Sequence, residues 1–400
     1  MTENIDNPFN SFWMGGYECS DQLNNTGQRV DLMGATHHIE NLDGDYRALL
    51  DFGIRTVREG IRWSRVERQP YEYDFSVVGH MLEVGKAHGI QQVWDICHFG
   101  FPDDLTPLHP QFTPRFTAIC SAFAAFHRRE CPDLPLIVTP INEVSFLSWL
   151  GGEVGGTSPF AVGIGWHVKY ALMRAYVAGV RAIRDIDPSA RILTTEPLVN
   201  VVPSLTTGNA ATEEARLKHL EQFQCLDMLT GNICPELGGR PEYLDLLGFN
   251  FYHNNQWVLG LGEILHWANP HSDPRWLPLS QLLLEAYQRY HRPILLSETS
   301  HPGDHRPLWI RFIAEQCKEV LRQQIPLLGI CIYPLIDRPD WDNLDHWHHS
   351  GLWDHEVVDG QHIRILNEEY AAELLKVQQG LPEDNIVKNE RVIPVIDHSQ

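Results

Sequence analysis

Basic residues are scarce in this sequence. Lysine and arginine number 31 against 52 aspartates and glutamates, so the formal net charge is -21 with histidine neutral. Such a chain repels phosphate backbones and anionic membrane surfaces, so nucleic acids and lipids are not expected partners. No run of eighteen apolar residues occurs, so no transmembrane helix is predicted. Residues 1–10 contain Glu3 and Asp6 and no apolar run, so we expect no ordinary secretory signal and a soluble, cytoplasmic protein.

Closely spaced cysteines, linkers and repeats are also absent. The eight cysteines form no Cys-x-x-Cys motif and several lie in apolar runs, so buried free thiols are expected rather than disulfides. With 400 residues, 43% of them hydrophobic, the chain can bury a large core. A single domain is predicted over residues 1–379, followed by a polar tail, 380–400, that packs on the domain or at an oligomer contact.

Short β-like runs alternate with longer amphipathic segments, which is the pattern of repeated βα units around a parallel sheet. The clearest helical segment, 168–183, places its apolar residues on one face and is followed by the helix stop Asp187-Pro188. Eight β-like runs predict a (β/α)₈ barrel in a single domain. They are residues 12–18, 56–63, 92–98, 136–143, 191–196, 244–253, 293–298 and 328–333.

Polar residues lie near the ends of these otherwise apolar runs. In a (β/α)₈ barrel the functional residues gather where strands end and the following loops begin, so strand ends are the first candidates for a site. A purely structural barrel has no need of such a set. The candidates are Glu18, Arg58, His98, Asn142, Glu143, Glu196, Tyr252, Glu298 and Tyr333.

Two of these candidates, Glu143 and Glu298, are carboxylates that follow β-like runs. Cleavage of a glycosidic bond requires two carboxylates across one cleft. One is held protonated and protonates the leaving oxygen, while the other stays ionised and attacks the anomeric carbon. Glu196, which ends the fifth run, is a rival to Glu143 as proton donor; alternatively it binds a hydroxyl or a cationic substituent.

Five motifs, in order along the chain, resemble those of the clan of retaining (β/α)₈ glycoside hydrolases, and most of all family 1, the β-glucosidase and β-galactosidase family. The resemblance covers nearly the whole barrel. It implies a retaining β-glycosidase that acts on a small soluble β-glycoside without cofactor or metal, with Glu143 as acid/base and Glu298 as nucleophile. The motifs are segment 57–65 (VREGIRWSR), Cys97-His98-Phe99, Asn142-Glu143, segment 248–252 (GFNFY) and Ser297-Glu298.

The same resemblance assigns supporting roles. Arg58 would support the nucleophile and favour its ionised form. His98 would bind a glycone hydroxyl and Asn142 the 2-hydroxyl, while Tyr252 would lie beside the nucleophile.

The sequence departs from the family pattern at the first and eighth strands. Glu18 stands where the family usually has glutamine, and segment 333–341 reads YPLIDRPDW in place of Trp-Ser-x-x-Asp-Asn-x-Glu-Trp. Asp340 would replace a longer glutamate that contacts outer glycone hydroxyls, and Trp341 is either a sugar platform or a packing residue. These departures predict a rebuilt glycone pocket and leave the sugar open.

Three other functions stay open: another enzyme of the clan (an endo-glycanase or a β-galactosidase-like exo-enzyme), a non-catalytic sugar-binding barrel, and a metal-dependent hydrolase. The last would use the histidine-rich segment 346–349 with nearby acids such as Asp354; otherwise this segment is a loop that shapes the glycone pocket. Segment 257–278 contains three tryptophans and is either an aglycone platform or the contact of a homo-oligomer.

Overall fold

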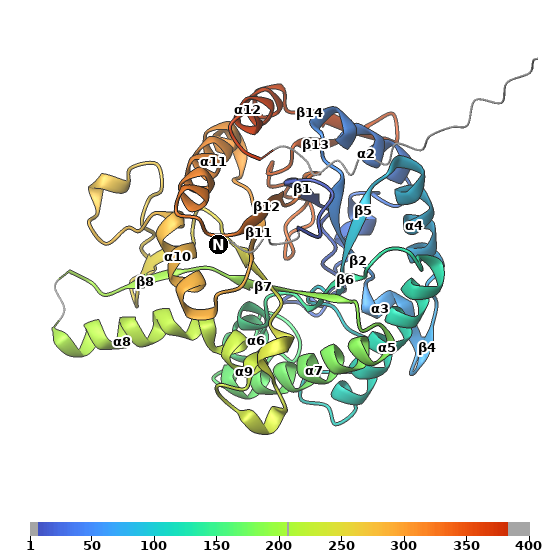
Figure 1. Ribbon diagram of the computed structural model, residues 1–400, viewed down its shortest axis with the longest axis horizontal. Coiled ribbons are helices and arrows are strands. Elements are labelled where there is room, and N and C mark those ends of the chain that lie inside the picture. Colours follow the sequence, from blue (N-terminus) through green and yellow to red (C-terminus); the bar gives the residue numbers. More distant parts are fainter. Residues whose placement is uncertain (1–6, 206–207, 383–400) are drawn as a thin grey trace, which may run out of the picture.

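Eight parallel strands close into a barrel in the computed structural model, which describes residues 7–205 and 208–382 (Figure 1). Each predicted run overlaps one strand, so the expected (β/α)₈ architecture is confirmed. Around the barrel, neighbours follow the order of the chain, and the last strand pairs with the first. The strands are β1 (Trp13–Gly16), β2 (Thr56–Gly60), β5 (Gln91–Cys97), β6 (Ile137–Ile141), β7 (Arg191–Pro197), β9 (Leu246–Asn250), β11 (Ile294–Thr299) and β12 (Leu327–Ile332).

Helices surround the barrel (Figure 1). The predicted helix lies within α7 (Gly165–Ile186), whose apolar face is buried and which ends at Ile186; the next residue, Asp187, is extended and precedes Pro188. Proline disfavours helical conformation in the residue before it, which explains this end. The other α-helices are α1 (Leu32–Ala35), α2 (Leu42–Leu49), α3 (Trp63–Val66), α4 (Ser76–His88), α5 (Phe112–Glu130), α6 (Val144–Gly152), α8 (Asn209–Leu220), α9 (Gln224–Thr230), α10 (Leu279–Tyr290), α11 (Arg306–Arg322) and α12 (Glu368–Gln378).

Three two-stranded sheets lie in the segments outside the barrel. An antiparallel pair joins β3 (Glu67–Gln69) to β4 (Glu72–Tyr73), and a parallel pair joins β8 (Asn200–Val202) to β10 (Gln256–Val258). The hairpin of β13 (Trp353–Val358) and β14 (Gln361–Leu366) follows the loop after β12. Single 3₁₀ turns are η1 (Leu50–Phe52), η2 (Glu221–Phe223), η3 (Pro235–Leu237), η4 (Pro241–Tyr243), η5 (Pro270–Ser272) and η6 (Gly303–His305).

The barrel interior is packed with side chains. Seven of the eight strands each place an apolar residue in one buried cluster, which leaves no open channel. The eighth, β2, instead contributes Arg58, which is fully buried and reaches across to β11. The interior therefore changes from apolar to charged at the level of Arg58. The strand residues of this cluster are Met14, Val93, Ile137, Leu193, Leu246, Leu295, Leu328 and Cys331, the last two both from β12.

The cysteines are free thiols, as predicted; seven are buried and Cys234 is half-buried. Among the described residues, no helix combines the length and the apolar character needed to cross a membrane. The predicted domain boundary at residue 379 falls directly after α12, and most of the predicted tail, 383–400, lies outside the described residues.

Candidate active site

A cavity of about 1000 Å³ opens where the barrel strands end. Predicted residues from six of the eight barrel strands or the loops that follow them meet there, as expected for the carboxyl ends of barrel strands. Aromatic rings form much of its wall. The predicted residues that line the cavity are Glu18, His98, Glu143, Tyr252, Glu298, Tyr333 and Trp341.

Glu298, near the end of β11, is held on both carboxylate oxygens. Arg58 Nη1 donates to Oε1 at 2.8 Å, and the Tyr252 hydroxyl donates to Oε2 at 2.7 Å. The carboxylate is nearly buried and faces the cavity. Each carboxylate oxygen of Glu298 thus accepts one strong hydrogen bond. The carboxylate still borders the cavity, where a ligand could reach it.

Arg58 links β2 to the two strands that carry its acidic partners. Its Nη2 donates to Asp95 Oδ2 at 2.6 Å, while Nη1 also donates to the Ser297 carbonyl at 2.9 Å. The guanidinium lies over the Tyr333 ring at 5.2 Å. A fully buried arginine is tolerated only when it is paired and hydrogen-bonded, and Asp95 and Glu298 meet that need.

Glu143 follows β6 and has a different environment. It lies in the left-handed backbone region, with φ of 45°, where non-glycine residues are uncommon and often functional. Asn250 Nδ2 donates to its Oε1 at 2.9 Å. Burial, reinforced by the charge of Glu298, raises the pKa of Glu143 to about 8 although the Asn250 hydrogen bond opposes the rise. This environment favours the protonated form of Glu143.

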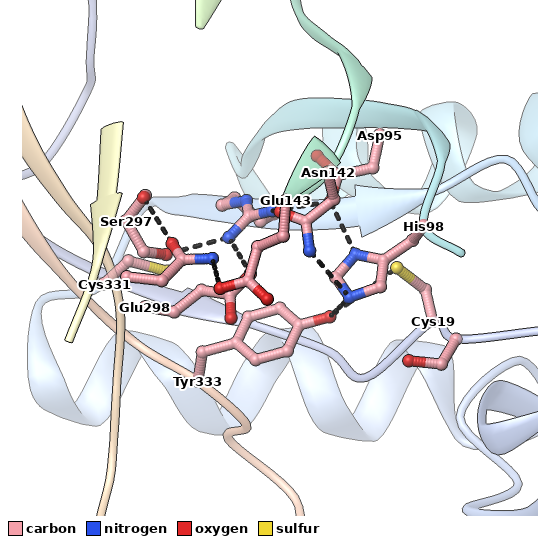
Figure 2. A network of polar contacts seen from close by, with 12 residues as sticks. Cys19, Asp95, His98, Asn142, Glu143, Ser297, Glu298, Cys331 and Tyr333 are labelled. Carbon is pink, nitrogen blue, oxygen red and sulfur yellow. Dashed lines mark hydrogen bonds and ion pairs between the residues drawn. The ribbon is translucent and has the colours of Figure 1, made fainter. Parts of the chain in front are cut away.

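A chain of polar contacts joins Arg58 to His98 through Asp95 and Asn142. Figure 2 shows His98 beside Asn142, with a dashed line between the two side chains. His98 Nδ1 lies 2.8 Å from Asp95 Oδ2, and His98 Nε2 lies 3.2 Å from Asn142 Nδ2. Asn142 Oδ1 accepts from Arg58 Nη2 at 3.2 Å. Asn142 is fully buried behind the residues that line the cavity, so its direct contact with a 2-hydroxyl stays a prediction.

Glu18 forms the wall beside β1. Its Oε1 accepts from the Ser20 hydroxyl at 2.5 Å and from the Tyr333 hydroxyl at 3.3 Å, and its Oε2 lies 3.3 Å from Arg338 Nε. Burial alone would raise the pKa of Glu18, but Arg338, His98 and Ser20 outweigh it and hold the pKa below its ordinary value. The wall thus presents an ionised acid paired with an arginine.

Trp341 and Asp340 are adjacent in sequence but play different parts. Trp341 lines the cavity, packs against Phe99, and lies under the guanidinium of Arg338 at 5.4 Å. Asp340 instead accepts the backbone N–H groups of residues 342 and 343 and lies 3.2 Å from His348 Nε2. Asp340 belongs to the loop behind the cavity wall, so its contact with a sugar stays a prediction.

Glu196 faces away from the main cavity. It lines a small separate space beside Cys225, and its Oε2 accepts the backbone N–H of Ser145 at 3.1 Å. Burial raises its pKa. The structure thus separates Glu196 from the two carboxylates that face the main cavity.

Segment 346–349, rich in histidine, and segment 257–278, rich in tryptophan, each place only some of their aromatic residues in the cavity lining. In segment 346–349, His348 lines the cavity while His346 is exposed. In segment 257–278, Trp257 lines the cavity, whereas Trp267 packs edge-on against Trp309 at 5.1 Å. Trp257, together with Leu259, is therefore the part of this segment that borders the cavity.

Three residues of the site were missed by the strand-end rule. Asp95 lies within β5, and its signal was a lone acid in an apolar strand. Asn250 and Arg338 lie inside segments 248–252 and 333–341, but their contacts with Glu143 and Glu18 depend on neighbours distant in sequence.

The fold resembles those of solved family 1 β-glucosidase structures. A family 1 β-glucosidase from Thermotoga maritima superposes with a TM-score of 0.73 at 13% identity, covering 94% of this chain and all of the other. A Thermotoga maritima β-glucosidase in complex with glucoimidazole gives 0.72 at 13% identity, over 93% of this chain and 99% of the other. A family 1 glycoside hydrolase from the same organism, complexed with a cyclophellitol analogue transition-state mimic, gives 0.73 at 13% identity, covering 94% and 99%.

Sequence comparison adds no relative: no family model matches the chain, and no curated protein matches it. At 13% identity the structural likeness confirms the (β/α)₈ fold that the motifs implied. A shared fold does not fix the chemistry, which depends on the residues of the site.

Proposed function

We propose that this protein is a retaining β-glycosidase in which Glu143 is the acid/base and Glu298 the nucleophile. The observation that carries the proposal is the contrast between two carboxylates that face one cavity. Glu298 pairs with the Arg58 guanidinium and accepts a hydrogen bond from the Tyr252 hydroxyl, which fix the orientation of its carboxylate. Glu143 has its pKa raised to about 8, chiefly by burial, and is a proton donor at neutral pH. Neighbouring carboxyl groups with opposed environments mark an acid and a nucleophile.

The reaction then has two steps. In the first, a Glu298 oxygen attacks the anomeric carbon while Glu143 gives its proton to the glycosidic oxygen, so the aglycone leaves as an alcohol and a glycosyl ester forms on Glu298. In the second, Glu143, now ionised, takes a proton from a water molecule that attacks the same carbon. The ester bond breaks, the sugar leaves with retained configuration, and both carboxyl groups return to their starting states.

Arg58 and Tyr252 prepare Glu298 for the first step. They hold the carboxylate from two sides, so that little reorganisation is needed when its charge moves to the new bond. Asn250 orients Glu143 in the same way, through the hydrogen bond to Oε1.

The substrate of this proposal is a small soluble β-glycoside. The cavity volume of about 1000 Å³ suits a disaccharide-sized ligand, and Trp257 and Trp341 supply flat apolar faces for sugar rings. Glu18 and Arg338 would meet the outer hydroxyls of the glycone. The sugar itself, a cytoplasmic location and a homo-oligomer stay predictions.

The first experiment is hydrolysis of a panel of aryl β-glycosides (gluco, galacto, fuco, xylo, manno and glucuronide) by the wild type and Glu298→Gln. We expect turnover of one sugar and its loss by several orders of magnitude in the variant, because the attacking oxygen is removed. A 2-fluoro analogue of the same sugar should add its glycosyl mass to Glu298, as read by peptide mass spectrometry.

Glu196→Gln is the matched control, because Glu196 is also a buried carboxylate at a strand end but faces the separate small space. This variant should keep its activity within about tenfold of the wild type. Wild-type activity in Glu298→Gln would remove Glu298 from the mechanism. A silent panel with measurable sugar binding would favour a binding protein on the same barrel.

A further inference from the structure

A second polar cluster lies outside the main cavity, where the loop after β12 meets β13. Its three side chains are Asp337, His349 and Asp354, and one ligand atom of each lies within 4.8 Å of the others. His349 Nδ1 is 3.7 Å from Asp337 Oδ2 and 3.5 Å from Asp354 Oδ1. None of the three residues lines the cavity, so the mechanism proposed above does not use them.

Asp337 is the member of the cluster with one carboxylate oxygen that accepts no hydrogen bond. Its side chain is fully buried, and Oδ1 accepts the backbone N–H of Ser350 at 3.0 Å. Oδ2 has no hydrogen-bond partner and faces His349 Nδ1 at a distance too long for a hydrogen bond. A buried carboxylate oxygen without a partner is costly, which indicates a cation at this position.

The distances from His349 Nδ1 to the two carboxylates suit a single small ion. Ligands about 2.0–2.2 Å from a tetrahedral zinc ion lie about 3.3 Å from each other. The two measured distances, 3.5 and 3.7 Å, exceed that value by only a few tenths of an ångström. One imidazole and two carboxylates form a mixed donor set that suits Zn²⁺ better than Mg²⁺ or Ca²⁺.

Neighbouring contacts hold the acids in place. Arg306 Nη1 donates to Asp354 Oδ1 at 2.8 Å and to the Gly351 carbonyl at 2.8 Å. The backbone N–H of Asp337 donates to the Trp353 carbonyl at 2.8 Å. Gly351 lies so close that a Cβ there would be 2.4 Å from Asp337 N, so only glycine fits without a shift. Such outer contacts orient metal ligands in known sites.

The formal charges of the cluster and of Arg306 do not cancel, so a cation would be attracted to the site. Two carboxylates carry -2, and Arg306, which pairs with Asp354, supplies +1. With neutral His349 the cluster keeps a net charge of -1. A proton on His349 would cancel this charge in place of a metal ion, so the test has to distinguish a bound metal ion from a proton.

We propose that Asp337, His349 and Asp354 bind one Zn²⁺-like divalent cation whose role is structural. Solvent would complete its ligand shell, since the His349 side chain is 60% exposed. The ion would tie the end of the loop to β13, and this loop carries Arg338 and His348 into the cavity wall. The proposal does not depend on the chemistry at Glu143 and Glu298.

The test is titration of chelator-treated full-length protein with Zn²⁺, followed by calorimetry, with Mg²⁺ and Ca²⁺ as comparison ions. We expect one equivalent of Zn²⁺ to bind and to raise the temperature of thermal unfolding, with no comparable binding of the other ions. His349→Ala should weaken Zn²⁺ binding by more than about 100-fold, because losing an outer contact alone costs about 10–100-fold. His349 is exposed, so this variant should fold.

His346→Ala is the control, because His346 is an exposed histidine of the same segment but lies outside the cluster. It should bind Zn²⁺ like the wild type. A second variant, Asp354→Asn, should also lose tight binding. Absence of stoichiometric binding in the wild type, or equal affinity in His349→Ala, would overturn the proposal. So would a metal-independent gain in stability at acidic pH that needs His349, since that result identifies a proton as the bridging cation.

Discussion

The floor and the wall of the cavity are built differently. The floor, defined here as Arg58, Asp95, Asn142 and Glu298, consists of buried groups that come from four barrel strands or their ends and bond to one another. The wall, defined here as Glu18, Arg338 and Trp341 together with Asp340 in the loop behind them, comes from the segments after β1 and β12. Removing one floor residue leaves a buried charge or amide unpaired, whereas a wall residue can exchange its partner for water.

This difference explains where the sequence departs from the family pattern. The floor residues all lie at positions where the motifs match or within the strands that carry them, while Glu18 and segment 333–341 lie in the wall. A substitution in the floor breaks several hydrogen bonds or ion pairs between buried groups, so few substitutions there preserve the site. A substitution in the wall breaks fewer such contacts, so more substitutions are tolerated. The comparison predicts large effects from floor variants and graded effects from wall variants.

Arg58→Met should give the largest loss of stability among the floor and wall variants, together with a large loss of activity. It removes the shared partner of Asp95 and Glu298, so we expect destabilisation of about 3–5 kcal/mol together with a loss of kcat on the order of 10³-fold. Denaturant unfolding and aryl-glycoside kinetics measure the two effects. Arg115→Met is the control, because Arg115 is also buried and paired with a buried glutamate, Glu67, outside the cavity. It should lose stability but keep kcat; equal losses of kcat would make the role of Arg58 merely structural.

The pH dependence of activity should report Glu143. Its folded pKa of about 8 lies above the ordinary value, so the protonated form that acts as general acid dominates below pH 8. We therefore expect kcat/KM to fall as pH rises through about 8. In Glu143→Gln this fall of kcat/KM at alkaline pH should disappear. The rate should drop by about 10²–10⁴-fold on substrates with poor leaving groups and by less on dinitrophenyl glycosides, which need little protonation of the leaving group. An unchanged fall in the variant would assign it to another group.

The sequence was sufficient for the barrel but not for the direction of every strand-end side chain. Apolar runs and helix stops located all eight strands because burial on both faces leaves a clear signal. Direction follows strand alternation: Leu193 is interior, so Thr195 shares its side of β7 and Glu196 faces outward. In β11, Leu295 is interior, so regular alternation would place Ser297 inward and Glu298 outward. A register shift between Leu296 and Glu298 accounts for its inward direction.

Pairings across loops were also beyond the sequence. The Glu18 contact with Arg338 joins residues 320 positions apart, and it depends on the path of the loop after β12. Nothing in the local pattern of either residue fixes that path. In contrast, the convergence of Glu143, Glu298, Tyr252 and His98 follows from barrel geometry alone, because all the strands present their carboxyl ends to one side.

Glu18→Gln should change sugar preference more than rate. Glutamine keeps an acceptor for Ser20 and Tyr333 but loses the charge that pairs with Arg338. We expect the ratios of kcat/KM among the six glycosides to shift by about 10–100-fold, with kcat on the best substrate within about tenfold of the wild type. Ser20→Ala, which removes one partner of Glu18 without changing its charge, should shift the ratios less. A loss of kcat comparable with that of Arg58→Met would place Glu18 in the floor.

Asp340→Asn should have the smallest effect, although the family pattern predicts a sugar contact at this position. Its carboxylate is engaged by two backbone N–H groups of its own loop and by His348, and an asparagine oxygen can still accept from that backbone. We expect kcat/KM within about threefold of the wild type for every glycoside in the panel. His348→Ala extends the test, since it removes the other partner and also opens the wall. A selective loss of more than about tenfold on one sugar in Asp340→Asn alone would mean that the loop turns this carboxylate toward the glycone when ligand binds, and that the wall rearranges while the floor stays fixed.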